Sequence, residues 1–307
     1  MLVFSTSAFL GWSLGANDSA NTFGTAVSSR MVSFRLATML VAVFAVAGAW
    51  LQGAAGTHTL QGLTAQTART AWMVSLAAAA TMTLMTALKL PASASQATVG
   101  AIIGLGLAQN DVYWGGLGKV ILCWIGTPVG AAVICVLVYR VLAAVVRTWN
   151  PSVFVYDPVM RAALIVCGCY SAYSLGANNV ANVSAMLAEG TGLSANEAAL
   201  FGGLCIALGA MTFSKGVMFT VGRGIVKLDV FAALCTVLAL ALVVHVYAVI
   251  GVPVSTSQGI IGALIGIGWV KGMHTVRYDM LFRIVVGWLT TPLLAGALSW
   301  TLITLAL

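Results

Sequence analysis

The chain has 307 residues, of which 61% are hydrophobic and only 7% are charged, against roughly a quarter charged residues in soluble domains. So few charged side chains cannot cover a water-facing surface, and this excludes an ordinary soluble protein. The net charge of +7 comes from basic residues in short loops between apolar stretches, a distribution typical of membrane proteins and not of nucleic-acid-binding proteins.

Apolar stretches of up to about 20 residues recur along the chain, and a helix of that length crosses roughly 30 Å of hydrocarbon. They lack the alternation of a β-barrel, and backbone amides in lipid must bond within their own segment, so we predict an all-α polytopic membrane protein. Ten crossings are expected, near residues 1–29, 36–54, 71–90, 91–108, 120–140, 162–188, 198–213, 229–250, 253–270 and 284–305. Two of these segments, 1–29 and 162–188, are long and contain polar breaks, so the alternative for them is a broken or re-entrant helix.

Two motifs recur in the same order at nearly the same offset, which indicates an internal duplication. Residues 13–21 read SLGANDSAN and residues 174–182 read SLGANNVAN, with seven of nine positions identical at an offset of 161. Residues 91–106 read PASASQATVGAIIGLG and residues 253–268 read PVSTSQGIIGALIGIG, with nine of sixteen identical at an offset of 162.

Charged residues at equivalent positions predict that the two repeats are inverted in the membrane. Arg30 and Arg35 follow the first motif, whereas the matching stretch of the second half contains Glu189 and Glu197. The opposite contrast follows in the next loop, where residues 55–70 carry only Arg69 and their counterpart holds Lys215, Arg223 and Lys227. Because basic residues mark the cytoplasmic side, equivalent loops are expected on opposite sides.

The duplication divides the chain into a first membrane repeat at 1–146, a cytoplasmic linker at 147–161 and a second membrane repeat at 162–307. With five crossings of the cell membrane in each half, both termini are expected on its external side and the linker on its cytoplasmic side.

The first motif places polar side chains within an apolar helix. Asn17, Asp18 and Asn21 lie within about one turn, and the two asparagines share a face. An ionised carboxylate facing lipid costs roughly 2.5–3.5 kcal/mol, so we expect Asp18 to face a cavity or a cation. Carboxylate, amide and hydroxyl oxygens suit a hard cation. The alternative is a helix cap at the membrane surface, but the recurrence of the motif in the second half favours a site.

The second motif is typical of a helix start. Pro91 or Pro253 precedes hydroxyl residues and a glutamine: Ser93, Ser95 and Gln96 in one half, and Ser255, Thr256, Ser257 and Gln258 in the other. A helix N-terminus presents free N–H groups and a partial positive charge, so two starts brought together by pseudo-symmetry would form an anion cradle. The alternative is a capped helix at the interface without a ligand.

With these motifs the sequence resembles the inorganic phosphate transporter family over essentially its whole length. The resemblance implies a cation-coupled symporter of a tetrahedral inorganic oxyanion, with phosphate as the first candidate, Na⁺ or H⁺ as the coupling ion, no cofactor, and a homodimer. It implies a cation at Asn17, Asp18, Asn178 and Asn179, with sodium as the metal ion at Asp18. It implies the anion at Asn17, Asn21, Ser93, Ser95, Gln96, Asn178, Asn182, Ser255, Thr256, Ser257 and Gln258.

Three departures from the family pattern keep a second substrate open. Asn179 stands where the family usually has aspartate, Gln96 and Gln258 stand where histidine is common, and Ala94 replaces a hydroxyl residue. Asparagine at this place resembles the sulfate permeases of the family, and sulfate, which carries no proton near neutral pH, favours donors over carboxylates. An uncoupled anion channel is a further alternative. An enzyme is not expected, because the spans contain no nucleophile–base pair or metal-ligand spacing.

Overall fold

The computed structural model describes residues 1–224, 228–272 and 277–306, and every regular element in these residues is an α-helix, which confirms the predicted class. Lys227, used in the charge comparison above, lies outside the described residues. The helices are α1 (Leu2–Ser28), α2 (Phe34–Gln52), α3 (Ala54–Gln61), α4 (Ala68–Ala87), α5 (Ala94–Gln109), α6 (Trp114–Trp149), α7 (Val153–Asn179), α8 (Ala181–Thr191), α9 (Ala195–Phe213), α10 (Lys215–Gly224), α11 (Val230–Ile250), α12 (Thr256–Lys271) and α13 (Tyr278–Ala306).

In the described part of the chain, seven helical segments are long and apolar enough to cross a membrane: α2, α4, α6, α7 with α8, α9, α11 and α13. Helix α1 has 27 residues but carries the polar motif. Helices α5 and α12 have 16 residues each, or about 24 Å at 1.5 Å per residue, which is shorter than the hydrocarbon layer. The count of ten crossings therefore stays a prediction.

The predicted segment 162–188 is a broken helix, as its polar motif allowed. Helix α7 ends at Asn179 and α8 begins at Ala181. The Nδ2 group of Asn182 donates to the carbonyl oxygen of Asn179 at 3.0 Å, and the N–H of Val183 turns to the carbonyl of Val180 instead. A side chain that inserts into the backbone ladder in this way is a usual cause of a helix break.

Two further helices, α3 and α10, were not predicted. They follow α2 and α9, which are equivalent in the two repeats, so the duplication extends to them. Much of the expected linker at 147–161 is helical, because α6 extends to Trp149 and α7 begins at Val153.

Helices of one half pack against helices of the other half, and equivalent helices do so in equivalent pairs. Helix α5 packs on α13 and α12 packs on α6, while α9 packs on α1 and α2 packs on α7. The contacts are close: a Cβ on Gly100 would collide with the carbonyl oxygen of Pro292, and a Cβ on the equivalent Gly262 would collide with that of Pro128. Small residues at such crossings let two helices approach closely within a membrane.

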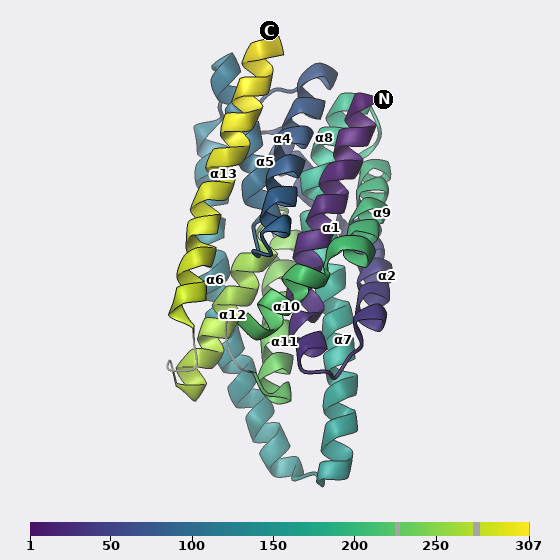
Figure 1. The fold of residues 1–307 in the computed structure, drawn as a ribbon, viewed down its shortest axis with the longest axis vertical. Coiled ribbons are helices and arrows are strands. Elements are labelled where there is room, and N and C mark those ends of the chain that lie inside the picture. The colour runs from purple at the N-terminus through teal and green to yellow at the C-terminus, as the bar shows by residue number, and fades with distance from the viewer. Residues whose placement is uncertain (225–227, 273–276, 307) are drawn as a thin grey trace.

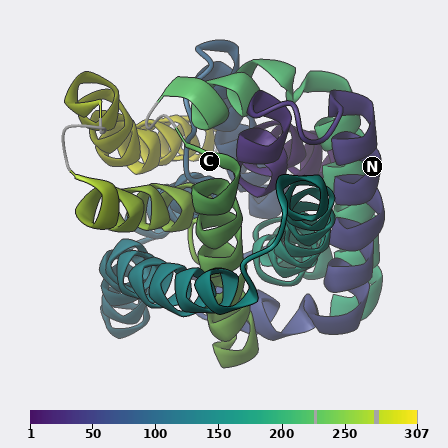
Figure 2. The same cartoon turned by 90° about the horizontal axis from the view of Figure 1, so that it is seen from below.

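Equivalent helices also run in opposite directions (Figure 1). Helix α1 runs away from the end where both termini lie, and α7 runs toward it; α13 ends at this same end, whereas α6 ends at the opposite one, near the α6–α7 connection. Seen from below, α6, α12 and α13 lie on one side of the molecule, and α1, α2 and α7 on the other, with α11 between them (Figure 2).

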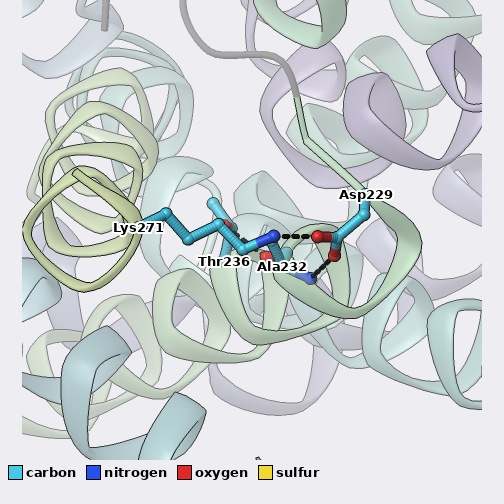
Figure 3. A network of polar contacts seen from close by, with 4 residues as sticks. All are labelled: Asp229, Ala232, Thr236 and Lys271. Atoms are coloured by element: carbon cyan, nitrogen blue, oxygen red, sulfur yellow. Dashed lines mark hydrogen bonds and ion pairs between the residues drawn. The ribbon is translucent and has the colours of Figure 1, made fainter. Parts of the chain in front are cut away.

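Polar contacts link the C-terminal ends of α5 and α12 to the connections that precede α4 and α11. At the end of α12, Lys271 forms an ion pair with Asp229, which also accepts from the N–H of Ala232 at 2.7 Å and so caps the start of α11 (Figure 3). At the equivalent place in the first half, Asp111 accepts from the N–H of Ala65 at 3.0 Å. The connections before α4 and α11 are thus each fixed to the end of a short helix.

Candidate functional site

The first motif and its repeat meet inside the protein. Asp18 lies within α1 and Asn179 ends α7, and neither side chain is more than 1% exposed. The Nδ2 group of Asn179 donates a hydrogen bond of 2.7 Å to Oδ2 of Asp18. Equivalent residues of the two repeats are therefore direct neighbours, and any site between them is shared by both halves.

Asn17 fixes the extended segment that precedes α5. Its Nδ2 group donates to Oγ1 of Thr86 at 2.9 Å and to the carbonyl of Leu90 at 3.0 Å, and its Oδ1 accepts from the N–H of Ala92 at 3.0 Å. Both protons of the amide are used in these bonds, so Asn17 has none left for an anion, although its oxygen retains a lone pair.

Asn178 does the same for the segment that precedes α12. Its Nδ2 donates to the carbonyl of Val252 at 3.1 Å, and its Oδ1 accepts from the N–H of Val254 at 2.9 Å. The first asparagine of each motif thus positions the helix start of the second motif within the same half.

The two helix starts are formed as the sequence predicted. Ser93 caps α5 by accepting from the N–H of Gln96 at 3.2 Å, and Ser255 caps α12 by accepting from the N–H of Gln258 at 3.1 Å. Ser255 also lies 2.9 Å from the hydroxyl of Ser257. These capping residues are almost completely buried, so the helix starts face the protein interior and not a membrane surface.

Hydrogen bonds between the halves bring the helix starts and the asparagine motifs together. The hydroxyl of Ser95 in α5 donates to the carbonyl of Val254, just before α12, at 2.9 Å. Asn182 donates to Oγ of Ser95 at 3.3 Å, and Asn21 donates to Oγ1 of Thr256 at 3.1 Å. Each half therefore contributes an asparagine to the helix start of the other half.

Six buried acceptor oxygens in this cluster have no hydrogen-bond partner among the described residues. They are Oδ1 of Asp18, Asn21, Asn179 and Asn182, and Oε1 of Gln96 and Gln258. A buried acceptor left unpaired costs about 1–3 kcal/mol. One of the six belongs to the Asp18 carboxylate and the other five to amide side chains of the two motifs, and carboxylate and amide oxygens are hard ligands that a cation would satisfy.

Several polar residues near the cluster were not predicted. Buried hydroxyl oxygens of Ser19, Thr25 and Thr98 also have no partner in the described part of the chain. Thr25 lies four residues after Asn21 and Thr98 three after Ser95, so each shares a helix face with a predicted residue. Site residues were predicted from motifs that recur in both halves, and these three residues do not recur. The equivalent positions of the second half hold the apolar residues Val180, Met186 and Ile260.

The comparisons with known proteins agree with this architecture. The sequence profile of the phosphate transporter family matches residues 14–299. A protein of Methanocaldococcus jannaschii named "Putative phosphate permease" is 30% identical over 289 residues, covering 94% of this chain and 92% of that protein. The sulfate permease CysP of Bacillus subtilis is 27% identical over 310 residues, covering 98% of this chain and 86% of that protein.

A solved structure shows the same fold over the full length. The structure described as the sodium-dependent phosphate transporter superposes with a TM-score of 0.88 at 23% identity and covers 100% of this chain and 99% of that one. The chain therefore belongs to the phosphate transporter family, and it is a membrane transporter, not an enzyme.

Proposed function

We propose that this member of the phosphate transporter family is a symporter that couples the uptake of inorganic phosphate to sodium. The observation that carries the proposal is the set of unpaired acceptor oxygens on Asp18, on its neighbour Asn179 and on other residues of the two motifs, whose asparagines Asn21 and Asn182 contact the two buried helix starts. A site with both features has groups for a cation and an anion at once, and symport requires that both ions bind the protein.

The cation is proposed at Asp18. A negative carboxylate buried without a basic partner is costly, and a bound cation offsets that cost. Oδ1 of Asp18 and Oδ1 of Asn179 are both unpaired and belong to side chains that already contact each other, so they provide two ligands from opposite repeats. Sodium is preferred to a proton because amide oxygens add ligands for a metal ion, and because the matching solved structure is described as sodium-dependent.

The anion is proposed between the starts of α5 and α12. The first turn of a helix has N–H groups without partners in the helix, and its dipole favours negative charge. Ser95 and Thr256 stand in those first turns and are each contacted by an asparagine of the other motif. We assign Asn17 and Asn178 to positioning these starts, because their amide groups bond to the preceding backbone.

The two halves are proposed to be inverted repeats. Support comes from the opposite directions of equivalent helices and from the contrast of basic and acidic loops. On this proposal the repeats at 1–146 and 162–307 place both termini outside and the 147–161 connection in the cytoplasm. The homodimer implied by the family resemblance stays a prediction.

Sulfate is the second candidate substrate, and a specific residue favours it. Asn179 leaves the centre with one carboxylate, which repels a fully ionised dianion less than two would. The sulfate permease of Bacillus subtilis is among the relatives of this chain. Phosphate is placed first because Asp18 can accept a hydrogen bond from protonated phosphate but not from sulfate.

The test is uptake of radiolabelled phosphate and sulfate by proteoliposomes, with sodium and proton gradients imposed separately. The proposal predicts accumulation of phosphate above its external concentration with a sodium gradient alone. Accumulation of sulfate but not phosphate would show that sulfate is the substrate. Uptake that never exceeds equilibrium would show that the protein is an uncoupled channel and not a symporter.

A further inference from the structure

A second cluster of basic residues borders a cavity of about 570 Å³ outside the central site. Lys89, Lys215 and Arg277 line it, together with the hydroxyl residue Thr220. Arg277 pairs with Asp279 at 3.0 Å. Within the described ranges, neither lysine has a carboxylate within ion-pair distance, so both ammonium groups remain available to an anion.

The cluster is continuous with the central site along the backbone. Lys89 directly precedes Leu90, whose carbonyl accepts from Asn17 at 3.0 Å, and the same segment leads to the N-cap Ser93 of α5. Lys215 begins α10, and α10 packs along α1, which carries Asp18. An anion at the cavity is therefore at the edge of the elements that form the proposed site.

Lys89 occupies a backbone conformation that normally belongs to glycine. Its φ is 59°, and the pseudo-equivalent residue of the second half is Gly251, with φ 78°. In the second half, a Cβ on Gly251 would lie 3.1 Å from the carbonyl oxygen of Ala55. In the first half, the residue equivalent to Ala55 is Gly216, which has no side chain. The stem of Lys89 uses this space: its Cγ lies 3.3 Å from the position that a Cβ on Gly216 would take. Lys89 follows the C-cap Leu88 of α4 in a Schellman cap, where glycine is the usual residue, so the helix end requires the left-handed conformation but not the lysine side chain.

The cluster exists at only one of the two pseudo-equivalent places. The positions equivalent to Lys89, Lys215 and Arg277 are Gly251, Ala54 and Tyr113, none of which is charged. Arg277 of the charged version directly precedes α13, and α13 begins on the side of the molecule away from the two chain termini, as α1 ends there (Figure 1). Arg30 also follows α1 at this end, which the charge distribution assigns to the cytoplasm.

We propose that Lys89 and Lys215 form a second anion site, which binds a phosphate group at the cytoplasmic mouth of the transport route. The proposal rests on the proposed function for the identity of the transported ion. Two ammonium groups without carboxylate partners attract a dianion and raise its local concentration, and the effect is screened by salt. The site lowers the half-saturating phosphate concentration on the cytoplasmic side and leaves the external one unchanged.

The test measures phosphate transport from each side separately, in inside-out and right-side-out membrane vesicles. The variants are Lys89→Gly, which copies Gly251 and relieves the left-handed backbone, and Lys215→Gln; Lys89→Arg retains the charge. Lys119→Gln is the matched control, since Lys119 is an exposed lysine near the start of α6. Each neutral variant should raise the cytoplasmic half-saturation about two- to fivefold, the range of one exposed ion pair, and the increase should shrink at high salt.

Unchanged cytoplasmic half-saturation in both neutral variants, or an equal rise on both sides, overturns the site. A lipid headgroup presents the same chemistry, so the comparison is repeated in phosphatidylcholine proteoliposomes with and without phosphatidylglycerol. An effect confined to the anionic lipid overturns binding of the free ion and assigns the lysines to the lipid. If the wild type carries sulfate and not phosphate, the proposed function fails, while the one-sided effect measured with sulfate still decides whether this anion site exists.

Discussion

Replacement of Asp18 by asparagine should abolish concentrative uptake without disturbing the fold. Oδ2 of Asp18 accepts from Asn179, and Oδ1 has no partner among the described residues. An asparagine at position 18 keeps the first bond only when its oxygen faces Asn179. Its Nδ2 then replaces Oδ1 and directs a donor at the position proposed for the cation.

The expected loss of cation affinity is large. A carboxylate 4 Å from a unit positive charge contributes about 4 kcal/mol at an effective dielectric constant of 20, which corresponds to roughly a thousandfold in affinity. The effect on folding has the opposite sign or is small, because a neutral amide costs less to bury than an unpaired carboxylate. Coupling and stability should therefore separate in the variant Asp18→Asn.

The assay compares phosphate accumulation under a sodium gradient with phosphate counterflow without one, at equal amounts of inserted protein. Asp18→Glu is the matched control, since it retains the charge and should retain sodium dependence at reduced affinity. Accumulation by Asp18→Asn with the sodium dependence of the wild type would refute the assignment of the cation to this carboxylate.

Four other changes test separate parts of the proposal. Asn179→Asp adds a second carboxylate, which should increase sodium dependence and shift the phosphate-to-sulfate uptake ratio toward phosphate; a shift toward sulfate would contradict it. Ser95→Ala removes the hydroxyl that donates to Val254 and accepts from Asn182, and the loss of a neutral hydrogen bond of about 0.5–1.5 kcal/mol that positions the helix starts predicts a phosphate KM raised roughly two- to tenfold with normal expression. Gly100→Ala places a methyl group against the α13 backbone and should destabilise the protein by about 1–3 kcal/mol, measured as a lower midpoint of thermal unfolding in detergent. Single cysteines that replace Arg30 and Glu189, in a background without the six native cysteines, should be labelled from opposite sides of the membrane; labelling from the same side contradicts the inverted repeat.

The repeat made much of this fold predictable from sequence. Once SLGANDSAN and SLGANNVAN were aligned, Asp18 and Asn179 became equivalent, and the structure brings these two side chains into contact. The helix starts at Ser93 and Ser255 followed from proline and hydroxyl residues, and both are N-caps. Recurrence is informative here because polar residues within a membrane are costly, so polar residues that occur at equivalent places in both halves indicate a functional site.

Features outside the repeated motifs were not predictable in the same way. Helices α3 and α10 are short and only moderately apolar, so they gave no signal of a crossing. The positioning role of Asn17 depends on backbone groups at Leu90 and Ala92, which lie more than seventy residues away in the chain. No local pattern predicts which end of an amide will meet a distant peptide group.

The departures from pseudo-symmetry suggest how one duplicated architecture performs a directional task. Backbone conformation is alike at one equivalent pair, since Lys89 and Gly251 are both left-handed. The chemistry differs, because charge is present on one side of each pair: Asp18 against Asn179 at the centre, and Lys89 against Gly251 nearer one end. A symmetric frame allows the same movement to open the site toward either side, whereas an asymmetric charge makes the two openings unequal in affinity for the anion. Exchange of both end pairs, with Lys89→Gly, Gly251→Lys, Lys215→Ala and Ala54→Lys together, should therefore transfer the lower half-saturation from the cytoplasmic to the external side. Kinetics that keep the original sidedness in this variant, when it is folded, would show that the direction is determined elsewhere.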